Sequence, residues 1–159
     1  MLGDGKGGFA RGPGSPFAVG KSPYPLAVGD LNGDAAPDIA VPNSGPGNRT
    51  VTVLLNDGKG AFHRAPKSPF EVAEAPFFVA IGDVNGDRKL DLVTTHDDRN
   101  QVSILLGDGR GNFQPAPGSP YRAGKGAWRL AVADFNGDDR LDIATSNLES
   151  DSVTVLLGK

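Results

Sequence analysis

Aspartate and asparagine recur at fixed places in three short loops of the sequence. The loops read DLNGDAAPD at 30–38, DVNGDRKLD at 83–91 and DFNGDDRLD at 134–142. Each loop has a carboxylate at its first, fifth and ninth positions, an amide at its third and a glycine at its fourth. A β-turn requires only one Asn-Gly or Asp-Gly pair. This register of oxygen-bearing side chains therefore indicates a bound cation.

The cation that such a loop suits best is calcium. Calcium takes about 6–8 oxygen ligands at about 2.3–2.6 Å. In a tight loop around an ion, positions 1, 3 and 5 point inward and position 7 offers its backbone carbonyl, while glycine at position 4 permits the bend. An all-oxygen set disfavours zinc and copper, and magnesium prefers a smaller shell with its own waters.

The sequence thus predicts one Ca²⁺ per loop and three per chain. The predicted ligands are Asp30, Asn32, Asp34, the Ala36 carbonyl and Asp38 in the first loop; Asp83, Asn85, Asp87, the Lys89 carbonyl and Asp91 in the second; and Asp134, Asn136, Asp138, the Arg140 carbonyl and Asp142 in the third. A plain β-turn is the alternative. It explains Asn-Gly-Asp but gives no reason for an aspartate at position 9 of every copy.

Composition narrows the possible partners. The chain has 159 residues, 38% of them hydrophobic and 22% charged, which is typical of a globular protein. Its formal net charge of −3 provides no basic surface for nucleic acid, and without cysteine it has no disulfide or thiolate site. No apolar run approaches the ~18 residues of a membrane span. The start MLGDGKGG lacks the basic and apolar regions of a signal peptide.

The loops are part of a longer repeat. Asp83 follows Asp30 by 53 residues and precedes Asp134 by 51. After each loop comes a second motif, and a Ser-Pro-aromatic triplet lies further on. The second motif reads TVLLNDGKGAF at 52–62, SILLGDGRGNF at 103–113 and TVLLGK at 154–159, with the remainder of the third copy, LGDGKGGF, at 2–9; the triplets lie at 15–17, 68–70 and 119–121.

Each repeat is expected to form four short antiparallel strands, with no helical periodicity anywhere. In the first repeat they are 26–30, 38–41, the alternating VTVLL at 51–55, and a weaker outer strand from Phe62 toward the Ser-Pro pair. Four strands in about 50 residues are typical of a β-propeller blade. We therefore predict an all-β, three-blade unit over residues 1–159, with blades at 15–67, 68–118 and 119–159.

The two ends of the chain are complementary. Residues 1–14 carry a turn and an outer strand, and the third blade lacks both. Propellers usually have about 4–8 blades. We therefore expect two copies to form a six-bladed ring in which each N-terminal strand completes the partner's last blade. A fragment of a larger propeller is the alternative.

Aromatic and histidine residues supply the other candidate sites. Tyr24, Phe77 and Trp128 each lie six residues before the first aspartate of a loop. Packing between blades is their expected role, and a ring of aromatics that stacks on sugars or a peptide is the functional alternative. His63 and His96 lack the partners of a catalytic triad or a zinc site, so both are expected at the solvated surface.

The three loops resemble the calcium loops of FG-GAP or VCBS repeats, which form the propeller blades of the integrin α-subunit and of many bacterial surface proteins. LLGDGRGNF resembles the turn that follows in the bacterial members, so the resemblance covers essentially the whole chain. It implies calcium at Asp30, Asn32, Asp34 and Asp38 and at their equivalents. The chain departs from the family in blade count, commonly seven, and in Pro37, which has no backbone donor and predicts an altered first site.

The resemblance further implies an extracellular or cell-surface module for adhesion or recognition. We expect this module, or a structural scaffold, to have no catalytic residues and to bind a protein or glycan. Two alternatives stay open: a carbohydrate-binding, lectin-like propeller, and a minimal or engineered propeller fragment with no ligand of its own.

Overall fold

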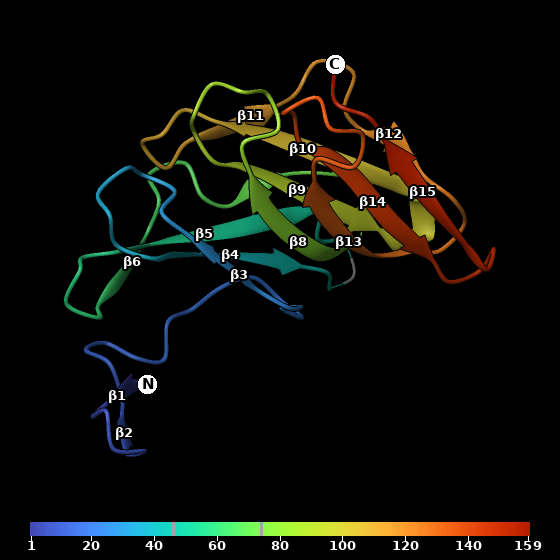
Figure 1. Ribbon diagram of the computed structural model, residues 1–159. Coiled ribbons are helices and arrows are strands. Elements are labelled where there is room, and N and C mark those ends of the chain that lie inside the picture. Colours follow the sequence, from blue (N-terminus) through green and yellow to red (C-terminus); the bar gives the residue numbers. More distant parts are fainter. Residues whose placement is uncertain (46, 74) are drawn as a thin grey trace.

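The computed structural model describes residues 1–45, 47–73 and 75–159. Within these residues the chain is all-β, as predicted: it contains one short 3-10 helix, η1 (Asp97–Arg99), and no α-helix. Every strand pair is antiparallel. Figure 1 shows one sheet per repeat, with the sheets side by side in chain order, and a small N-terminal hairpin that stands apart from them.

The first two sheets have the same topology, and the third is shorter. Within a repeat the strands follow one another across the sheet. The first sheet contains β3 (Ala27–Gly29), β4 (Asp38–Asn43), β5 (Thr50–Asn56), β6 (Phe62–Arg64) and β7 (Phe70–Glu71); the second contains β8 (Pro76–Gly82), β9 (Asp91–His96), β10 (Gln101–Gly107), β11 (Phe113–Pro115) and β12 (Tyr121–Arg122); the third contains β13 (Ala127–Ala133), β14 (Asp142–Asn147) and β15 (Ser152–Leu156); the hairpin contains β1 (Leu2–Gly3) and β2 (Phe9–Ala10).

The predicted outer strand is divided in two. β6 pairs with one end of β5, and β7 pairs with the other end. β11 and β12 pair with β10 in the same way. A turn that contains the Ser-Pro pair separates the two pieces, and this peptide bond is cis at Ser15-Pro16, Ser68-Pro69 and Ser119-Pro120. The triplets at 68–70 and 119–121 thus end in edge strands of the preceding sheet, β7 and β12, a few residues beyond the repeat boundaries expected from sequence.

Apolar side chains join neighbouring sheets. Val51 and Val53 alternate along β5, are fully buried, and share a hydrophobic cluster with Val79 of β8. Val102 and Ile104 of β10 likewise cluster with Leu130 of β13. Burying one such side chain contributes about 1.5–3 kcal/mol. Neighbouring sheets therefore share apolar clusters, the first two strands of one repeat approach the first strand of the next, and these contacts hold the sheets in a row.

A buried polar residue ends the second strand of each repeat. Asn43 and Asn147 lie there in the first and third repeats; the Asn43 amide donates to the Thr52 hydroxyl at 2.9 Å. The second repeat has His96, whose Nε2 is 3.0 Å from the Thr94 hydroxyl. His96 is fully buried, so the surface location predicted for it is wrong. The prediction holds for His63, which is exposed.

The burial of His96 follows from its place in the row of sheets. All of β9 is buried, because the second sheet has a neighbouring sheet on each face. Burial disfavours the charged imidazolium and lowers the pKa of His96 from 6.5 to about 4.

We expect His96 to make the protein less stable in mild acid. The folded-state pKa lies below the unfolded value, so its stabilisation is complete above about pH 6.5 and is lost as the pH falls toward 4. The loss amounts to about 2 kcal/mol between about pH 7.5 and pH 5. His96→Asn introduces the residue that the other two repeats have at this position, and it should remove the part of the stability that depends on the imidazole charge. Urea unfolding of both proteins at the two pH values, in chelator, measures it; an equal change with pH in both would contradict the assignment.

Candidate metal centres

Each of the three loops joins the first strand of its repeat to the second and bends at two residues with left-handed backbone. Position 4 has φ of 80°, 76° and 78° at Gly33, Gly86 and Gly137, so the role predicted for glycine is confirmed. Position 6 is also left-handed, with φ of 66°, 65° and 64° at its three residues, which are Ala35, Arg88 and Asp139. A non-glycine residue in this conformation costs roughly 1–2 kcal/mol. Sequence analysis missed it because the three residues share no chemical property.

The aspartate at position 1 holds this bend. Asp30 accepts hydrogen bonds from the backbone N–H groups of Gly33 at 2.7 Å, Asp34 at 3.1 Å and Ala35 at 2.9 Å. Burial alone raises the pKa of Asp30, but these hydrogen bonds outweigh it and the pKa is lowered. The equivalent N–H groups bind the first aspartates of the other loops. Pro37 therefore leaves the hydrogen bonds of the first loop unchanged.

The carboxylate at position 5 has a different environment in each loop. Asp34 accepts hydrogen bonds from the Asn32 amide at 2.9 Å and from the Ala36 N–H at 2.8 Å. In the other two loops the residue at position 7 adds a cation to the same carboxylate. The Lys89 ammonium is 3.4 Å from Asp87, and the Arg140 guanidinium is 2.6 Å from Asp138. The first loop has alanine there, so its Asp34 carries no such ion pair with position 7.

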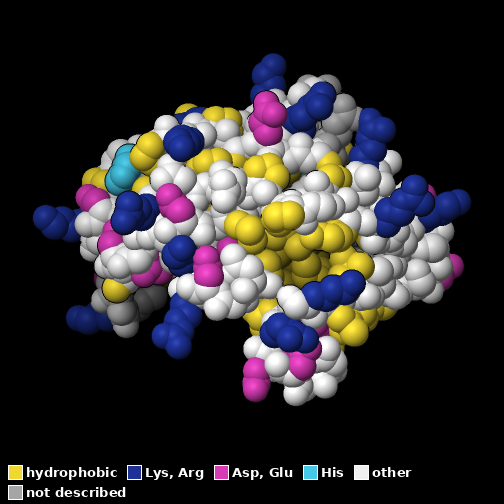
Figure 2. All heavy atoms as spheres, turned by 90° about the horizontal axis from the view of Figure 1, so that it is seen from above, with side chains coloured by type: hydrophobic (Ala, Val, Ile, Leu, Met, Phe, Trp, Pro, Cys, Tyr) yellow, Lys and Arg dark blue, Asp and Glu magenta, His cyan; other side chains and the backbone are white. Residues whose placement is uncertain are grey.

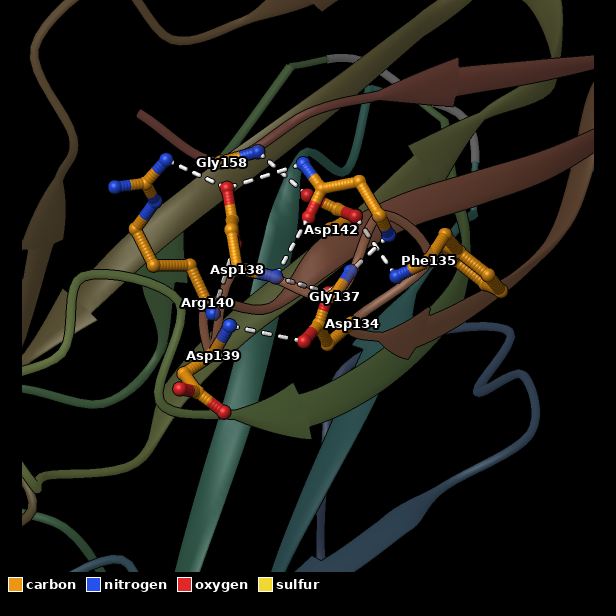
Figure 3. A network of polar contacts seen from close by, with 9 residues as sticks. Asp134, Phe135, Gly137, Asp138, Asp139, Arg140, Asp142 and Gly158 are labelled. Carbon is orange, nitrogen blue, oxygen red and sulfur yellow. Dashed lines mark hydrogen bonds and ion pairs between the residues drawn. The ribbon is translucent and has the colours of Figure 1, made fainter.

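The aspartate at position 9 is fully buried in every repeat. Asp38 accepts one backbone N–H from Leu31 at 2.9 Å and one from Asn56, at the end of β5, at 2.8 Å. Asp91 and Asp142 accept the equivalent pairs, at 2.8–3.0 Å, as Figure 3 shows for Asp142 with Phe135 and Gly158. Each carboxylate thus ties the loop and the end of the third strand to the start of the second.

These contacts explain why every loop has an aspartate at position 9, which a plain β-turn does not explain. Burial raises the pKa of Asp38, and the charges of Asp34 and Asp30 act in the same direction. Burial likewise raises the pKa of Asp91, with the charges of Asp87 and Asp83 acting in the same sense. The loop carboxylates are therefore close enough to repel one another, and two backbone N–H groups stabilise the innermost one.

The donor set of the loops matches the chemistry of calcium, since carboxylate, amide and carbonyl oxygens are its ordinary ligands. Among the residues described, however, no group of three or more His, Cys, Asp or Glu side chains converges as a metal site would. The oxygens instead accept backbone N–H groups. A carboxylate oxygen has two lone pairs, and Asp38 uses one on each oxygen. Capacity for a cation remains, shared with these hydrogen bonds.

The three aligned aromatic residues form a continuous row across the repeats. The ring centroids of Tyr24 and Phe77 are 4.4 Å apart, and those of Phe77 and Trp128 are 3.8 Å apart. This contact agrees with the expected packing role between repeats. Tyr24 is 39% exposed at its end of the row. Phe77 and Trp128 lie near the starts of β8 and β13, and Tyr24 lies just before β3, whereas the loops begin where these strands end.

The repeats of this chain match a known protein family. The family model described as FG-GAP-like repeat matches residues 43–94 and 83–145, which together span more than half of the chain. The chain therefore belongs to the FG-GAP-like repeat family. Such repeats are generally structural or recognition modules and are typical of extracellular proteins. No curated protein matches the chain. Across the described part of the chain, none of the helices has the length and apolar character that crossing a membrane requires.

We expect the position 9 aspartate to stabilise the fold without any ion. Asp91→Asn replaces one accepting oxygen by an amide NH₂ that faces a buried N–H, which costs about 2–3 kcal/mol. Asp87→Asn is the matched control, because this carboxylate is exposed and its ion pair with Lys89 contributes at most about 1 kcal/mol. Urea unfolding in chelator measures both losses. Equal losses would show that position 9 has no structural role of its own.

Proposed function

We propose that the chain is a calcium-binding β-propeller unit that serves recognition or adhesion, or acts as a scaffold for it. The observation that carries the proposal is the shared loop: oxygen-bearing residues at positions 1, 3, 5 and 9 recur in three repeats on one backbone path. Family membership supports it, since FG-GAP-like repeats are generally structural or recognition modules. The module acts outside the cell or at its surface, where such repeats are typical.

Calcium in this proposal is held by the side chains at positions 1, 3, 5 and 9 and by the carbonyl at position 7. It neutralises carboxylates that repel one another, and this is the chemistry that it supplies. Because the ion binds the folded loop, each site adds about 2.7 kcal/mol of stability at a hundredfold excess over Kd. Three divalent ions add six positive charges, three times two, and so change the formal charge from −3 to +3.

The three sites should differ in affinity because position 7 differs. The Lys89 and Arg140 side chains pair with the carboxylates of Asp87 and Asp138. A calcium ion competes with these cations in the second and third loops. Ala36 offers no such competitor in the first loop. The first loop is therefore the tightest site of the three.

Two copies of the chain supply the blades of one six-bladed ring in this proposal. One copy has three repeats, and propellers usually have about 4–8 blades. The repeats lie in a row with an apolar face exposed at each end. Leu26 and Val28 are 55% and 56% exposed at one end, and Val153 is 68% exposed at the other. Two such rows close when each end meets the opposite end of the other copy.

Removal of calcium should lower the melting temperature. We expect three calcium ions per chain by isothermal titration and elemental analysis, and a fall in melting temperature when a chelator is added. Asp34→Asn should abolish the tightest of the three binding steps, whereas Asp138→Asn should abolish a weaker one. If the melting temperature does not change with chelator and no calcium is found, the calcium proposal fails.

A carbohydrate-binding role is the second candidate, and the aromatic row favours it. Sugars stack on aromatic faces, and Tyr24 is exposed beside Phe77. If this role holds, a glycan array detects binding that Tyr24→Ser reduces by at least about tenfold, since an aromatic contact is worth about 1.5 kcal/mol. Phe135→Ser, at an exposed aromatic residue away from the row, is the control. Equal binding by both variants would rule out the row as the sugar site.

A further inference from the structure

Equivalent apolar residues are buried in two repeats and exposed in the third. Val51 and Val102 are fully buried, whereas Val153, at the same place in the third repeat, is 68% exposed. Val53 is fully buried, whereas its equivalent Val155 is 48% exposed. The residues that bury these positions in the first two repeats come from the next sheet along the chain. The face of β15 therefore has the composition of an interface.

The backbone edge of β15 also lacks its neighbours. β5 pairs with β6 and β7, and β10 pairs with β11 and β12. Among the described residues, β15 pairs with β14 alone. An exposed strand edge presents a row of N–H and C=O groups to another chain. The third repeat is thus open at the edge where the others carry their two short edge strands.

The N-terminal segment contains the edge elements that the third repeat lacks. Phe9 corresponds to Phe62 and Phe113, and residues 15–17 repeat the cis Ser-Pro-aromatic triplet. Phe17 packs edge-to-face on Phe62 at 5.3 Å, as Phe70 does on Phe113 at 5.2 Å. This segment therefore lies against the first repeat as the edge of a preceding repeat would. The β1–β2 hairpin and β15 lie at opposite ends of the molecule in Figure 1.

A cavity beside β15 occupies the place that Phe113 fills one repeat earlier. Its volume is about 580 Å³, and a hollow floored by hydrophobic side chains is visible on the face of the molecule in Figure 2. Phe113 shares a cluster with Val53, Leu55, Ala65, Phe70, Leu92 and Leu105. Six residues of the cavity wall are their equivalents in the next repeat: Ile104, Leu106, Ala116, Tyr121, Ile143 and Leu156.

We propose that this cavity and the edge of β15 bind residues 9–17 of a second copy of the chain, with Phe9 in the cavity. The inference rests on the proposed two-copy ring and identifies the site that joins its halves. Ser68 and Ser119 accept the backbone N–H groups of Val53 and Ile104, each at 2.9 Å. By the same pattern Ser15 of one copy accepts the N–H of Val155 in the other.

In the proposed exchange between two copies, β2 keeps the strand register that it has in the hairpin. Ala10 pairs with Leu2 within the hairpin, as Gln114 pairs with Leu106 in the second repeat. Leu157 is the equivalent of Leu106 in the third repeat. Leu157 of the second copy, which directly follows β15, therefore replaces Leu2 of β1 opposite Ala10. Phe9, which is 69% exposed in one copy, becomes buried, and the two exchanges of a two-fold dimer are identical.

The test is the assembly of the full chain in calcium. Sedimentation velocity should find a dimer, and Phe9→Asp should raise its dissociation constant more than about 100-fold, because a buried aromatic is lost at two equivalent places. His63→Asp, an equal change of charge at an exposed edge residue, should leave the dimer intact. Phe9→Asp should still bind three calcium ions, so loss of the dimer is distinguishable from loss of the metal sites.

A second measurement tests directly which residues of the two copies lie opposite each other. The chain has no cysteine, so Ala10→Cys combined with Leu157→Cys introduces the two thiols alone. Directly opposed strand residues have Cβ atoms about 4.5–5.5 Å apart, and oxidation should give a covalent dimer that neither single variant gives. A monomeric wild-type chain that still binds calcium would overturn the inference and the two-copy ring, and would leave the proposed calcium-binding role standing. A disulfide within one chain, or a ladder of larger oligomers, would overturn it as well.

Discussion

In every repeat one fully buried carboxylate connects three segments of backbone. Asp38 begins β4, and its two oxygens accept N–H groups from the preceding loop and from the end of β5. A buried charge is tolerated only when it is paired or hydrogen-bonded, so the loop and the third strand cannot move independently of this side chain. The same arrangement at Asp91 and Asp142 makes the three loops copies of one structure.

This arrangement separates the loop carboxylates into two groups. The innermost one is satisfied by the protein itself, whereas Asp34 and Asp87 at position 5 are exposed. The Asp87 carboxylate forms an ion pair with the Lys89 ammonium, and the Asp34 carboxylate accepts hydrogen bonds from N–H groups of its own loop. The lysine and arginine at position 7 thus change the charge around the position 5 carboxylate and leave the backbone path of the loop unchanged.

Local pattern predicted much of the fold. Alternating apolar residues located the strands, and the glycine at position 4 was placed from the bend of the loop alone. The rest depends on neighbouring sheets. The pentapeptide VTVLL occurs at 51–55 and at 153–157, yet Val51 is fully buried and Val153 is 68% exposed. The burial of His96, the division of the outer strand and the backbone partners of Asp38 likewise arise from contacts distant in sequence.

The left-handed residue at position 6 has a further consequence. Ala35, Arg88 and Asp139 share nearly one backbone conformation, and all three are exposed. One is apolar, one basic and one acidic. Nothing in the hydrogen bonding of the loop involves their side chains, because Asp30 and its equivalents bind only their N–H groups. A fixed scaffold thereby displays an interchangeable side chain at a constant orientation in each repeat, so that the surface can acquire a new specificity while the framework beneath it stays the same.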